Sequence, residues 1–308
     1  MRVRSLALVV ALATACGIVS TEPDGEGQGV LGQWVRSGGI ERTYTLHLPA
    51  AYNTQRRWPL LVLLHGAGDT GPEFEARIGM GALADSAGVI AVYPDGVDSS
   101  WASGCGCTEA DILKIDDVRF IRTLVNQLRD SLAVDPARVF VGGYSQGGML
   151  TERLVCDMSD ALAGAVTVSA TLPSRIASTC NPQRPVPMLF FHGTADTTFL
   201  QDGMVKDGEQ FYSVPATLAF FAQEDGCTGA PSYQSDSTSA LGSTPTEVGG
   251  YGSCQDGRIT LFEIENGGHT WPGSPGPWPS YLGPVATSVD ANHEILKFIQ
   301  LNGGFLTP

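Results

Sequence analysis

Positive charge is scarce in this chain of 308 residues. Lys and Arg number 18 against 32 Asp and Glu, which gives a formal net charge of −14 at pH 7, and no basic stripe interrupts the deficit. Such a surface repels a phosphate backbone, so nucleic acid is not expected as a partner. With 43% hydrophobic and 16% charged residues, the composition excludes intrinsic disorder and favours one globular domain with its own core.

Long apolar runs are missing beyond the first 15 residues, and no repeat of fixed period is found. Residues 1–15 place two Arg before ten apolar or small residues, which predicts a signal peptide, since this run is too short to span a bilayer. Cys16 follows directly and resembles the acylated cysteine of a bacterial lipobox, so a lipid anchor and plain secretion both stay open. Either route predicts a secreted or extracellular protein, or one anchored on the cell surface or in the periplasm. Residues 16–30 are expected to form a flexible acidic tether and 31–308 the folded domain.

Strand-like and helix-like patterns alternate along the folded domain. Several short runs are apolar on both faces, as in strands inside a covered sheet, and a longer one capped by Asp116 or Asp117 has helical spacing. This alternation predicts an α/β fold, with a mostly parallel central sheet and helices on both faces, in a single domain. The predicted elements are strands at 42–49, 58–64, 89–93, 139–141, 165–168, 188–191 and 259–264, helices at 116–132, 148–155 and 291–301, and loops at 229–257 and 272–284.

A G-x-S-x-G motif, Gly143 to Gly147, lies between a buried strand and a helix. This context is that of the nucleophile elbow of the α/β-hydrolase fold, in which small residues let strand and helix approach and leave the serine hydroxyl exposed. Ser145 is therefore the candidate nucleophile. No cysteine lies at the elbow, which disfavours a catalytic thiol.

A serine hydroxyl needs a base within hydrogen-bond reach, and the chain has only five histidines. His47 lies in a predicted strand, His293 lies in the final helix, and His65 and His192 each end a buried strand. His269 alone follows a late strand in a glycine-rich loop near the C-terminus. It is the predicted base.

The acid that orients the base is expected between serine and histidine, on a turn after a strand. Asp196 meets this requirement because it follows the predicted strand at 188–191 by a few residues. Asp202 and Asp207 compete but lie further into the loop. The order Ser145, Asp196, His269 is the chain order of this fold.

The tetrahedral intermediate of acyl transfer needs two N–H donors for its oxyanion. One is predicted to be the backbone N–H of Gln146, directly after the nucleophile. The other is expected from the glycine-rich turn after the strand at 58–64, with Ala67 as first choice and Gly68 as second.

Several segments together resemble a known family. They include GYSQGGM at 143–149, HGTAD at 192–196 and GGHTWPG at 267–273, with Trp101 before Cys105-Gly106-Cys107. These look like the secreted serine esterases grouped as polyhydroxybutyrate depolymerase-like proteins and feruloyl esterases, and the resemblance spans roughly residues 35–301. It implies the α/β-hydrolase fold and the same triad and oxyanion residues that were chosen above.

The resemblance leaves the substrate open among esters. Feruloyl esters of plant cell-wall polysaccharides are the first expectation, because polymer-degrading members often carry a separate substrate-binding domain and none is expected after Leu301. Poly(3-hydroxybutyrate) or its oligomers, and acetylated xylan, are the alternatives. Trp101, Trp271 and Trp278, with Tyr281, are candidate substrate contacts or else pin a proline-rich loop.

Six cysteines follow Cys16. The resemblance implies a disulfide between Cys227 and Cys254, while Cys105, Cys107, Cys156 and Cys180 then allow three connectivities. A zinc site would need histidines at ligand spacing, so no metal is expected. No cofactor is implied either.

Two other classes of protein remain open at this point. One is a serine peptidase of the same fold, although the chain lacks the length for an additional propeller domain. The other is a non-catalytic surface-binding protein, against which the complete Ser, Asp and His set argues.

Overall fold

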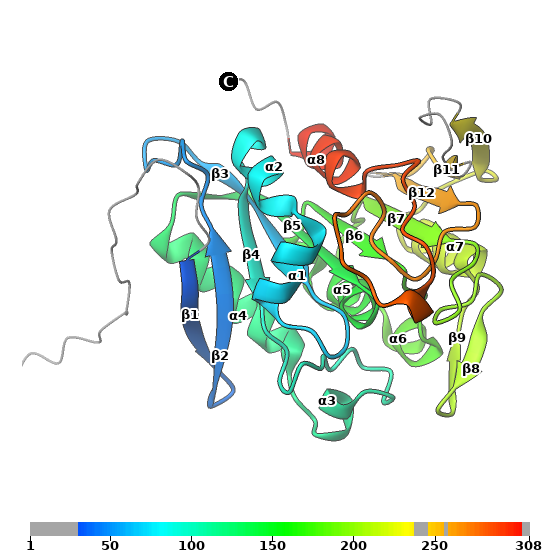
Figure 1. Ribbon diagram of the computed structural model, residues 1–308, viewed down its shortest axis with the longest axis horizontal. Coiled ribbons are helices and arrows are strands. Elements are labelled where there is room, and N and C mark those ends of the chain that lie inside the picture. The colour runs from blue at the N-terminus through cyan, green and yellow to red at the C-terminus, as the bar shows by residue number, and fades with distance from the viewer. Residues whose placement is uncertain (1–29, 237–245, 256–257, 304–308) are drawn as a thin grey trace, which may run out of the picture.

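The computed structural model describes residues 30–236, 246–255 and 258–303. One sheet of ten strands runs through the molecule in the order β1-β2-β4-β3-β5-β6-β7-β12-β11-β10, from the blue edge to the yellow edge in Figure 1. Strands β4, β3, β5, β6, β7 and β12 are parallel, and the strands at both edges pair antiparallel. The strands of this sheet are β1 Val30–Ser37, β2 Ile40–His47, β3 Trp58–Leu64, β4 Ile90–Pro94, β5 Val134–Tyr144, β6 Gly164–Val168, β7 Met188–Gly193, β10 Ser232–Asp236, β11 Thr246–Tyr251 and β12 Ile259–Ile264.

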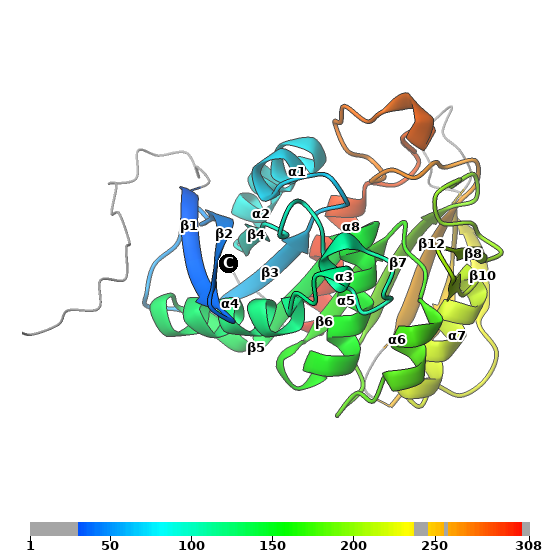
Figure 2. The same cartoon turned by 90° about the horizontal axis from the view of Figure 1, so that it is seen from below.

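Helices cover both faces of this sheet. In Figure 2, α1, α2 and α8 lie on one side, and α4, α5, α6 and α7 lie on the other. The helices are α1 Gly71–Ile78, α2 Met80–Ala87, α3 Glu109–Ile112, α4 Asp117–Ser131, α5 Gln146–Met158, α6 Ser174–Thr179, α7 Val214–Glu224 and α8 Ala291–Asn302. The α/β-hydrolase arrangement predicted from the sequence is confirmed as a single domain.

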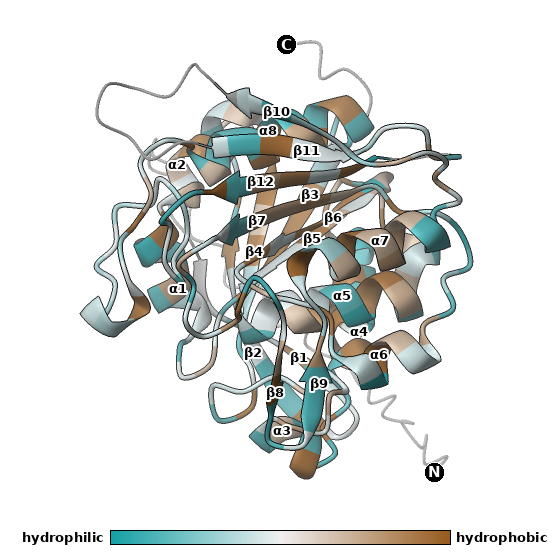
Figure 3. Cartoon of the chain, turned by 90° about the vertical axis from the view of Figure 1, so that its right-hand side faces the viewer, coloured by the Kyte–Doolittle hydropathy of each residue, from teal (hydrophilic) through white to brown (hydrophobic). Residues whose placement is uncertain are grey.

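Two hydrophobic cores lie back to back across the sheet. Successive side chains of a strand point to opposite faces, so Leu60 and Val62 of β3 join the core under α4 and α5, whereas Leu61 and Leu63 join the core under α1, α2 and α8. Both faces are apolar for this reason, and Figure 3 shows β7 and β12 largely in hydrophobic colours. Rigid strands buried in this way give the loops at their ends a fixed base.

Some local expectations are corrected. The segment 229–257, expected as a loop, contains β10 and β11, which extend the sheet from β12 through antiparallel pairs. A small separate hairpin, β8 Met204–Lys206 and β9 Glu209–Phe211, was not expected at all, because three-residue strands are too short to leave a periodic pattern. The cap of α4 is Asp116, whose carboxylate accepts the Arg119 N–H at 3.0 Å.

The first described strand begins at Val30, where folded structure was expected to begin. The predicted signal peptide, the lipobox-like Cys16 and most of the tether lie outside the described residues. Of the helices in the described part of the chain, none combines the length and the apolar character needed to cross a membrane.

Candidate active site

Four parallel strands end at the same edge of the sheet and bring the predicted site residues together. Ala67 follows β3, Ser145 follows β5, Asp196 follows β7 and His269 follows β12. The carboxyl ends of parallel strands meet at one edge, which is where open α/β sheets bind their ligands. Residues more than 200 positions apart in the chain therefore line one site.

Ser145 has a strained backbone. Its φ of 54° and ψ of −117° place a non-glycine residue in a region that L-residues avoid, between the end of β5 and the start of α5. The turn is so tight that a Cβ on Gly143 would lie 2.1 Å from the Gly147 carbonyl oxygen, and one on Gly147 would lie 2.4 Å from the Leu64 carbonyl oxygen. Only glycine fits at both positions, and this sharp turn holds the Ser145 side chain at the end of the sheet.

The Ser145, His269 and Asp196 side chains form a hydrogen-bonded chain. The His269 Nε2 lies 2.9 Å from the Ser145 Oγ, and the Nδ1 lies 2.7 Å from the Asp196 Oδ2. A carboxylate accepts, so Nδ1 carries the proton and Nε2 is free to accept from the serine hydroxyl. Both His269 and Asp196 are almost completely buried.

The carboxylate of Asp196 is kept ionised by its surroundings. Burial alone would raise its pKa, but the hydrogen bond and charge of His269, the charge of His192 and the Phe199 N–H together hold the pKa below its ordinary value. Its Oδ1 accepts the backbone N–H groups of Thr198 and Phe199, each at 2.8 Å. The acid is thereby fixed in both charge and orientation.

The loop that carries His269 is held by close backbone contacts. The His269 N–H donates to the Leu282 carbonyl at 2.6 Å, and the Tyr144 hydroxyl donates to the His269 carbonyl at 2.7 Å. The Phe199 ring stacks on the imidazole with centroids 5.7 Å apart. The base is thus positioned by the residue next to the nucleophile and by the residue three positions after the acid.

The two predicted oxyanion donors lie next to Ser145. Both Ala67 and Gln146 line the same cavity as the serine. Among the described residues the Ala67 N–H has no hydrogen-bond partner, whereas the Gly68 N–H donates to the Ser99 carbonyl at 2.9 Å. An unpaired N–H is available to a ligand and a paired one is not, so the geometry favours Ala67 over Gly68.

The four other histidines make structural contacts. His65 donates from Nδ1 to the Gly66 carbonyl and accepts the Gly96 N–H, and His192 donates to the Phe199 carbonyl. Burial lowers the pKa of both rings, so both stay neutral. His47 lies 3.3 Å from Glu75, and the exposed His293 lies 2.8 Å from Asp290 at the start of α8.

Two of the candidate substrate contacts are wrong. Trp101 and Trp271 are 0% exposed, so neither ring can touch a substrate. The Trp101 indole donates to the His65 carbonyl, and the Trp271 indole donates to Asn292 on α8. Large aromatic rings beside a site are as well suited to the core below it, and sequence alone does not separate the two.

The remaining aromatic candidates lie away from the cavity. Trp278 is half-buried and packs edge-on against Tyr144 with centroids 4.9 Å apart, and Tyr281 is 77% exposed. Neither residue lines the cavity that contains Ser145. Asp202 and Asp207, the competing acids, are exposed and make no contact with His269.

A cavity of about 160 Å³ opens beside Ser145. Its apolar wall consists of Met149, Phe199 and Phe211, which form a small hydrophobic cluster of their own with Ala170. The sequence analysis did not identify this wall, although Met149 lies one helical turn after the serine and Phe199 lies on the turn of the acid. The complete lining is Ala67, Cys107, Thr108, Ser145, Gln146, Met149, Thr198, Phe199, Lys206, Asp207 and Phe211.

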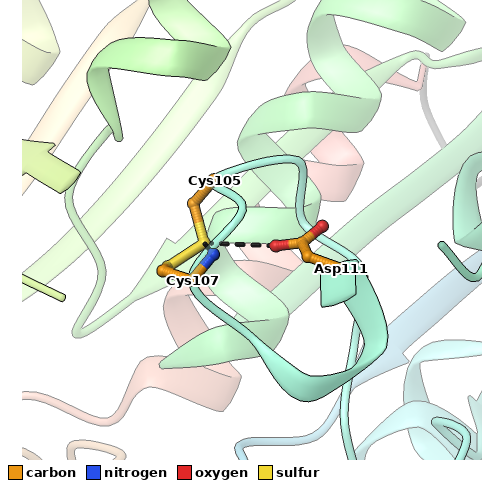
Figure 4. A group of neighbouring side chains, drawn as sticks. All are labelled: Cys105, Cys107 and Asp111. Carbon is orange, nitrogen blue, oxygen red and sulfur yellow. Dashed lines mark hydrogen bonds between the residues drawn. A yellow bond between two sulfur atoms is a disulfide. The ribbon is translucent and has the colours of Figure 1, made fainter. Parts of the chain in front are cut away.

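Three disulfides join the six cysteines of the folded domain. Cys227 pairs with Cys254, as the resemblance implied, and the two open pairings are Cys105 with Cys107 and Cys156 with Cys180. In the described part of the chain, the metal-ligand types that cluster are Cys105, Cys107 and Asp111 (Figure 4). The two sulfurs are bonded to each other, and Asp111 accepts the Gly104 and Gly106 N–H groups. This arrangement stabilises the loop beside the cavity and does not offer free thiolates to a metal.

Comparison with known proteins gives the same picture. The model of the alpha/beta hydrolase family matches residues 61–287. The protein named "Putative esterase NocK" of Nocardia uniformis subsp. tsuyamanensis is 31% identical over 85% of this chain and 80% of its own length. Feruloyl esterase C of Emericella nidulans is 29% identical over 80% of this chain and 82% of its own length.

Two further comparisons are more distant or partial. Feruloyl esterase B of Piromyces equi is 28% identical over 74% of this chain, which spans 42% of that protein. Among solved structures, an acetyl xylan esterase from Aspergillus awamori superposes with a TM-score of 0.61 at 14% identity, covering 89% of this chain and 99% of that one. At that identity the superposition shows a shared fold and nothing finer.

Proposed function

This chain belongs to the alpha/beta hydrolase family, as an esterase of the serine type, and on that premise we propose that it hydrolyses feruloyl (hydroxycinnamoyl) esters of plant cell-wall polysaccharides. The observation that carries the proposal is the chain of hydrogen bonds from Asp196 through His269 to Ser145, at 2.7 and 2.9 Å. Both bonds have the geometry that a charge-oriented general base requires. We assign Ser145 as nucleophile, His269 as base and Asp196 as the orienting acid.

The first step forms an acyl-enzyme. The Ser145 Oγ attacks the ester carbonyl carbon while His269 Nε2 takes the hydroxyl proton, and the carbonyl oxygen becomes an oxyanion. The Ala67 and Gln146 N–H groups face this oxyanion and stabilise its charge. When the tetrahedral intermediate collapses, the C–O bond to the alcohol breaks and His269 returns the proton to the leaving alcohol.

The second step releases the acid. Water attacks the acyl carbon, His269 takes the water proton, and the same two N–H groups stabilise the second oxyanion. Collapse breaks the bond to Ser145, which regains its proton from His269. Asp196 stays ionised throughout, because its lowered pKa lets it stabilise the imidazolium that forms in each step.

The shape of the cavity supports a single acyl group as the bound part of the substrate. Drug-sized ligands occupy pockets of roughly 300–1,000 Å³, whereas the cavity beside Ser145 measures about 160 Å³ and its apolar wall includes two phenylalanines. A hydroxycinnamoyl group suits such a wall, with the sugar left outside. The feruloyl esterases among the relatives support the same class of substrate.

The three disulfides suit an oxidising compartment, which supports export of the protein. Acetyl esters of xylan are the second candidate, favoured by the small volume of the cavity. Polyhydroxybutyrate, a peptide substrate and a purely binding role have no such observation behind them.

Two experiments test the proposal. Ser145→Ala is expected to lose more than about a hundredfold in hydrolysis of methyl ferulate, since loss of a triad nucleophile costs several orders of magnitude. Ser86→Ala, on the exposed side of α2, serves as the control. Retention of activity in the Ser145 variant would disprove the assignment.

The substrate class needs its own assay. Release of acid is compared for methyl ferulate, acetylated xylan, hydroxybutyrate oligomers and a peptide anilide at equal enzyme concentration. The highest kcat/KM is expected for methyl ferulate. A higher value for another substrate would replace the feruloyl assignment while leaving the roles of Ser145, His269 and Asp196 intact.

A further inference from the structure

The hairpin of β8 and β9 brings two charged residues to the cavity beside Ser145. Lys206 ends β8 and Asp207 begins the turn, and both line the cavity. The chain contains only three lysines, at 114, 206 and 297. In the described residues, neither the Lys206 ammonium nor the Asp207 carboxylate forms an ion pair or a side-chain hydrogen bond. A donor and an acceptor are thus available at the cavity wall.

The hairpin holds these two residues in a defined place. Asp207 and Gly208 form its two-residue turn, and both have positive φ, 52° and 78°, as a type I′ turn requires. The start of α6 anchors its second strand, because the Glu209 carboxylate accepts from the Ser174 hydroxyl and the Arg175 N–H and pairs with the Arg175 guanidinium at 3.0 Å. Glu209 is 3% exposed, so the turn is fixed to the body of the protein.

The apolar wall of the cavity selects the other half of the ligand. Phe211, the last residue of the hairpin, packs edge-on against Phe199 with centroids 5.5 Å apart, and Met149 joins them. Phe199 in turn stacks on His269. An acyl group attached to Ser145 therefore meets an aromatic and thioether surface first, and flat rings pack well on such a surface.

The paired charges select a neutral hydroxyl group. A carboxylate would accept from Lys206 but would be repelled by Asp207 and by the net charge of −14, and a cation would be repelled by Lys206. A hydroxyl both donates and accepts, so it can bond with the two side chains at once. Resting on the feruloyl esterase function proposed above, we propose that Lys206 and Asp207 are specificity residues that bind the ring hydroxyl of the hydroxycinnamoyl group, while Met149, Phe199 and Phe211 contact its ring.

The test compares two esters that differ only at this hydroxyl. Methyl ferulate carries a free 4-hydroxyl, and methyl 3,4-dimethoxycinnamate carries a methyl ether there. A site built to bond a substrate hydroxyl discriminates against the analogue without it, so the unmodified protein is expected to favour ferulate in kcat/KM by about tenfold or more. Asp207→Asn and Lys206→Met are each expected to reduce this ratio severalfold, mainly through activity on ferulate.

Matched controls have the same change of charge away from the cavity. Asp202→Asn changes an exposed carboxylate five residues earlier, and Lys297→Met changes an exposed ammonium on α8. Both should keep the ratio of the unmodified protein. An unchanged ratio in both Asp207→Asn and Lys206→Met, or no preference in the unmodified protein, would overturn the assignment of these two residues.

A third substrate separates this inference from the function on which it rests. Hydrolysis of 4-nitrophenyl acetate reports whether Ser145 still reacts, independently of the ring hydroxyl. If the unmodified protein hydrolyses the acetate but neither cinnamate ester, the feruloyl function fails, and the inference fails with it. If it hydrolyses both cinnamates equally, only the inference fails.

Discussion

The hydroxyl of Tyr144 donates a hydrogen bond of 2.7 Å to the backbone carbonyl of His269. Tyr144 directly precedes the nucleophile, so a single side chain ties the strand end that carries Ser145 to the loop that carries the base. Its ring also lies 5.0 Å from the imidazole and 4.9 Å from the Trp278 ring. The spacing between serine and histidine therefore depends on this residue as well as on the triad itself.

Tyr144→Phe is expected to lower kcat about three- to tenfold, because loss of a net 0.5–1.5 kcal/mol hydrogen bond loosens the His269 loop. KM should change little, since the ring stays in place and Tyr144 does not line the cavity. Steady-state kinetics on methyl ferulate measure both constants. Tyr281→Phe, at a residue that is 77% exposed, is the control, and equal kcat values for the two variants would show that the hydrogen bond does not position the base.

Asp196→Asn tests whether the acid orients the base. The amide of asparagine can donate to Nδ1 and so favour the tautomer with the proton on Nε2, which can no longer accept from Ser145. A fall in kcat of about 10³–10⁴ is expected, as for triad acids elsewhere. Thermal unfolding is measured in parallel to confirm folding. Asp202→Asn should behave as the unmodified protein, and a comparable loss there would contradict a specific role for Asp196.

Trp101→Phe tests the support of the oxyanion donors. Trp101 donates from its backbone N–H to the Gln146 side chain at 2.8 Å and from its indole to the His65 carbonyl at 2.9 Å, and only the indole bond is lost in the variant. We expect kcat to fall about tenfold, a fraction of the 10²–10³ that loss of a whole oxyanion donor costs. Binding of a phenylboronic acid, whose tetrahedral adduct with Ser145 resembles the intermediate, should weaken in parallel.

The control for this variant is Trp58→Phe. Trp58 is also buried and also donates its indole N–H to a backbone carbonyl, that of Asn53 at 2.8 Å, but at the opposite end of β3. It should lose stability without weakening boronate binding. Equal effects of the two substitutions on boronate binding would argue that Trp101 contributes to stability alone.

Asp225 makes stability depend on pH. Burial raises the pKa of this carboxyl from 3.8 to about 6, partly offset by the Val186 N–H. Between pH 4 and pH 6 the folded protein therefore binds more protons than the unfolded chain, and stability falls as pH rises through this window. Asp225→Asn removes this titration, so the difference in free energy of unfolding, variant minus unmodified protein, should grow by about 2–3 kcal/mol between pH 4 and pH 7.

Urea unfolding at a series of pH values measures this difference. Asp130→Asn, at an exposed position of α4, is the control and should give a difference that does not change with pH. A flat difference for Asp225→Asn would mean that the carboxyl titrates alike in the folded and unfolded states.

Local signals were enough to predict the central strands and the three triad candidates. Apolar runs such as residues 58–64 match β3 residue for residue, and the glycines around Ser145 announce a turn that only glycine allows. The short β8 and β9 and the edge strands β10 and β11 were missed, because their pairing depends on partners rather than on their own residues. Phe211 entered the cavity wall only through that pairing.

Chain order and local pattern determined the fold class, the elbow and the choice of His269, because each of these depends on residues that are close in sequence. The tertiary structure decided which groups face the cavity. Trp101 and Trp271 lie beneath the site instead of lining it, Cys105 bonds to Cys107, and Lys206 and Asp207 reach the cavity on a hairpin. Such outcomes depend on how elements distant in the chain pack together, and the same aromatic or charged residue suits the core, the surface or the site until that packing is known.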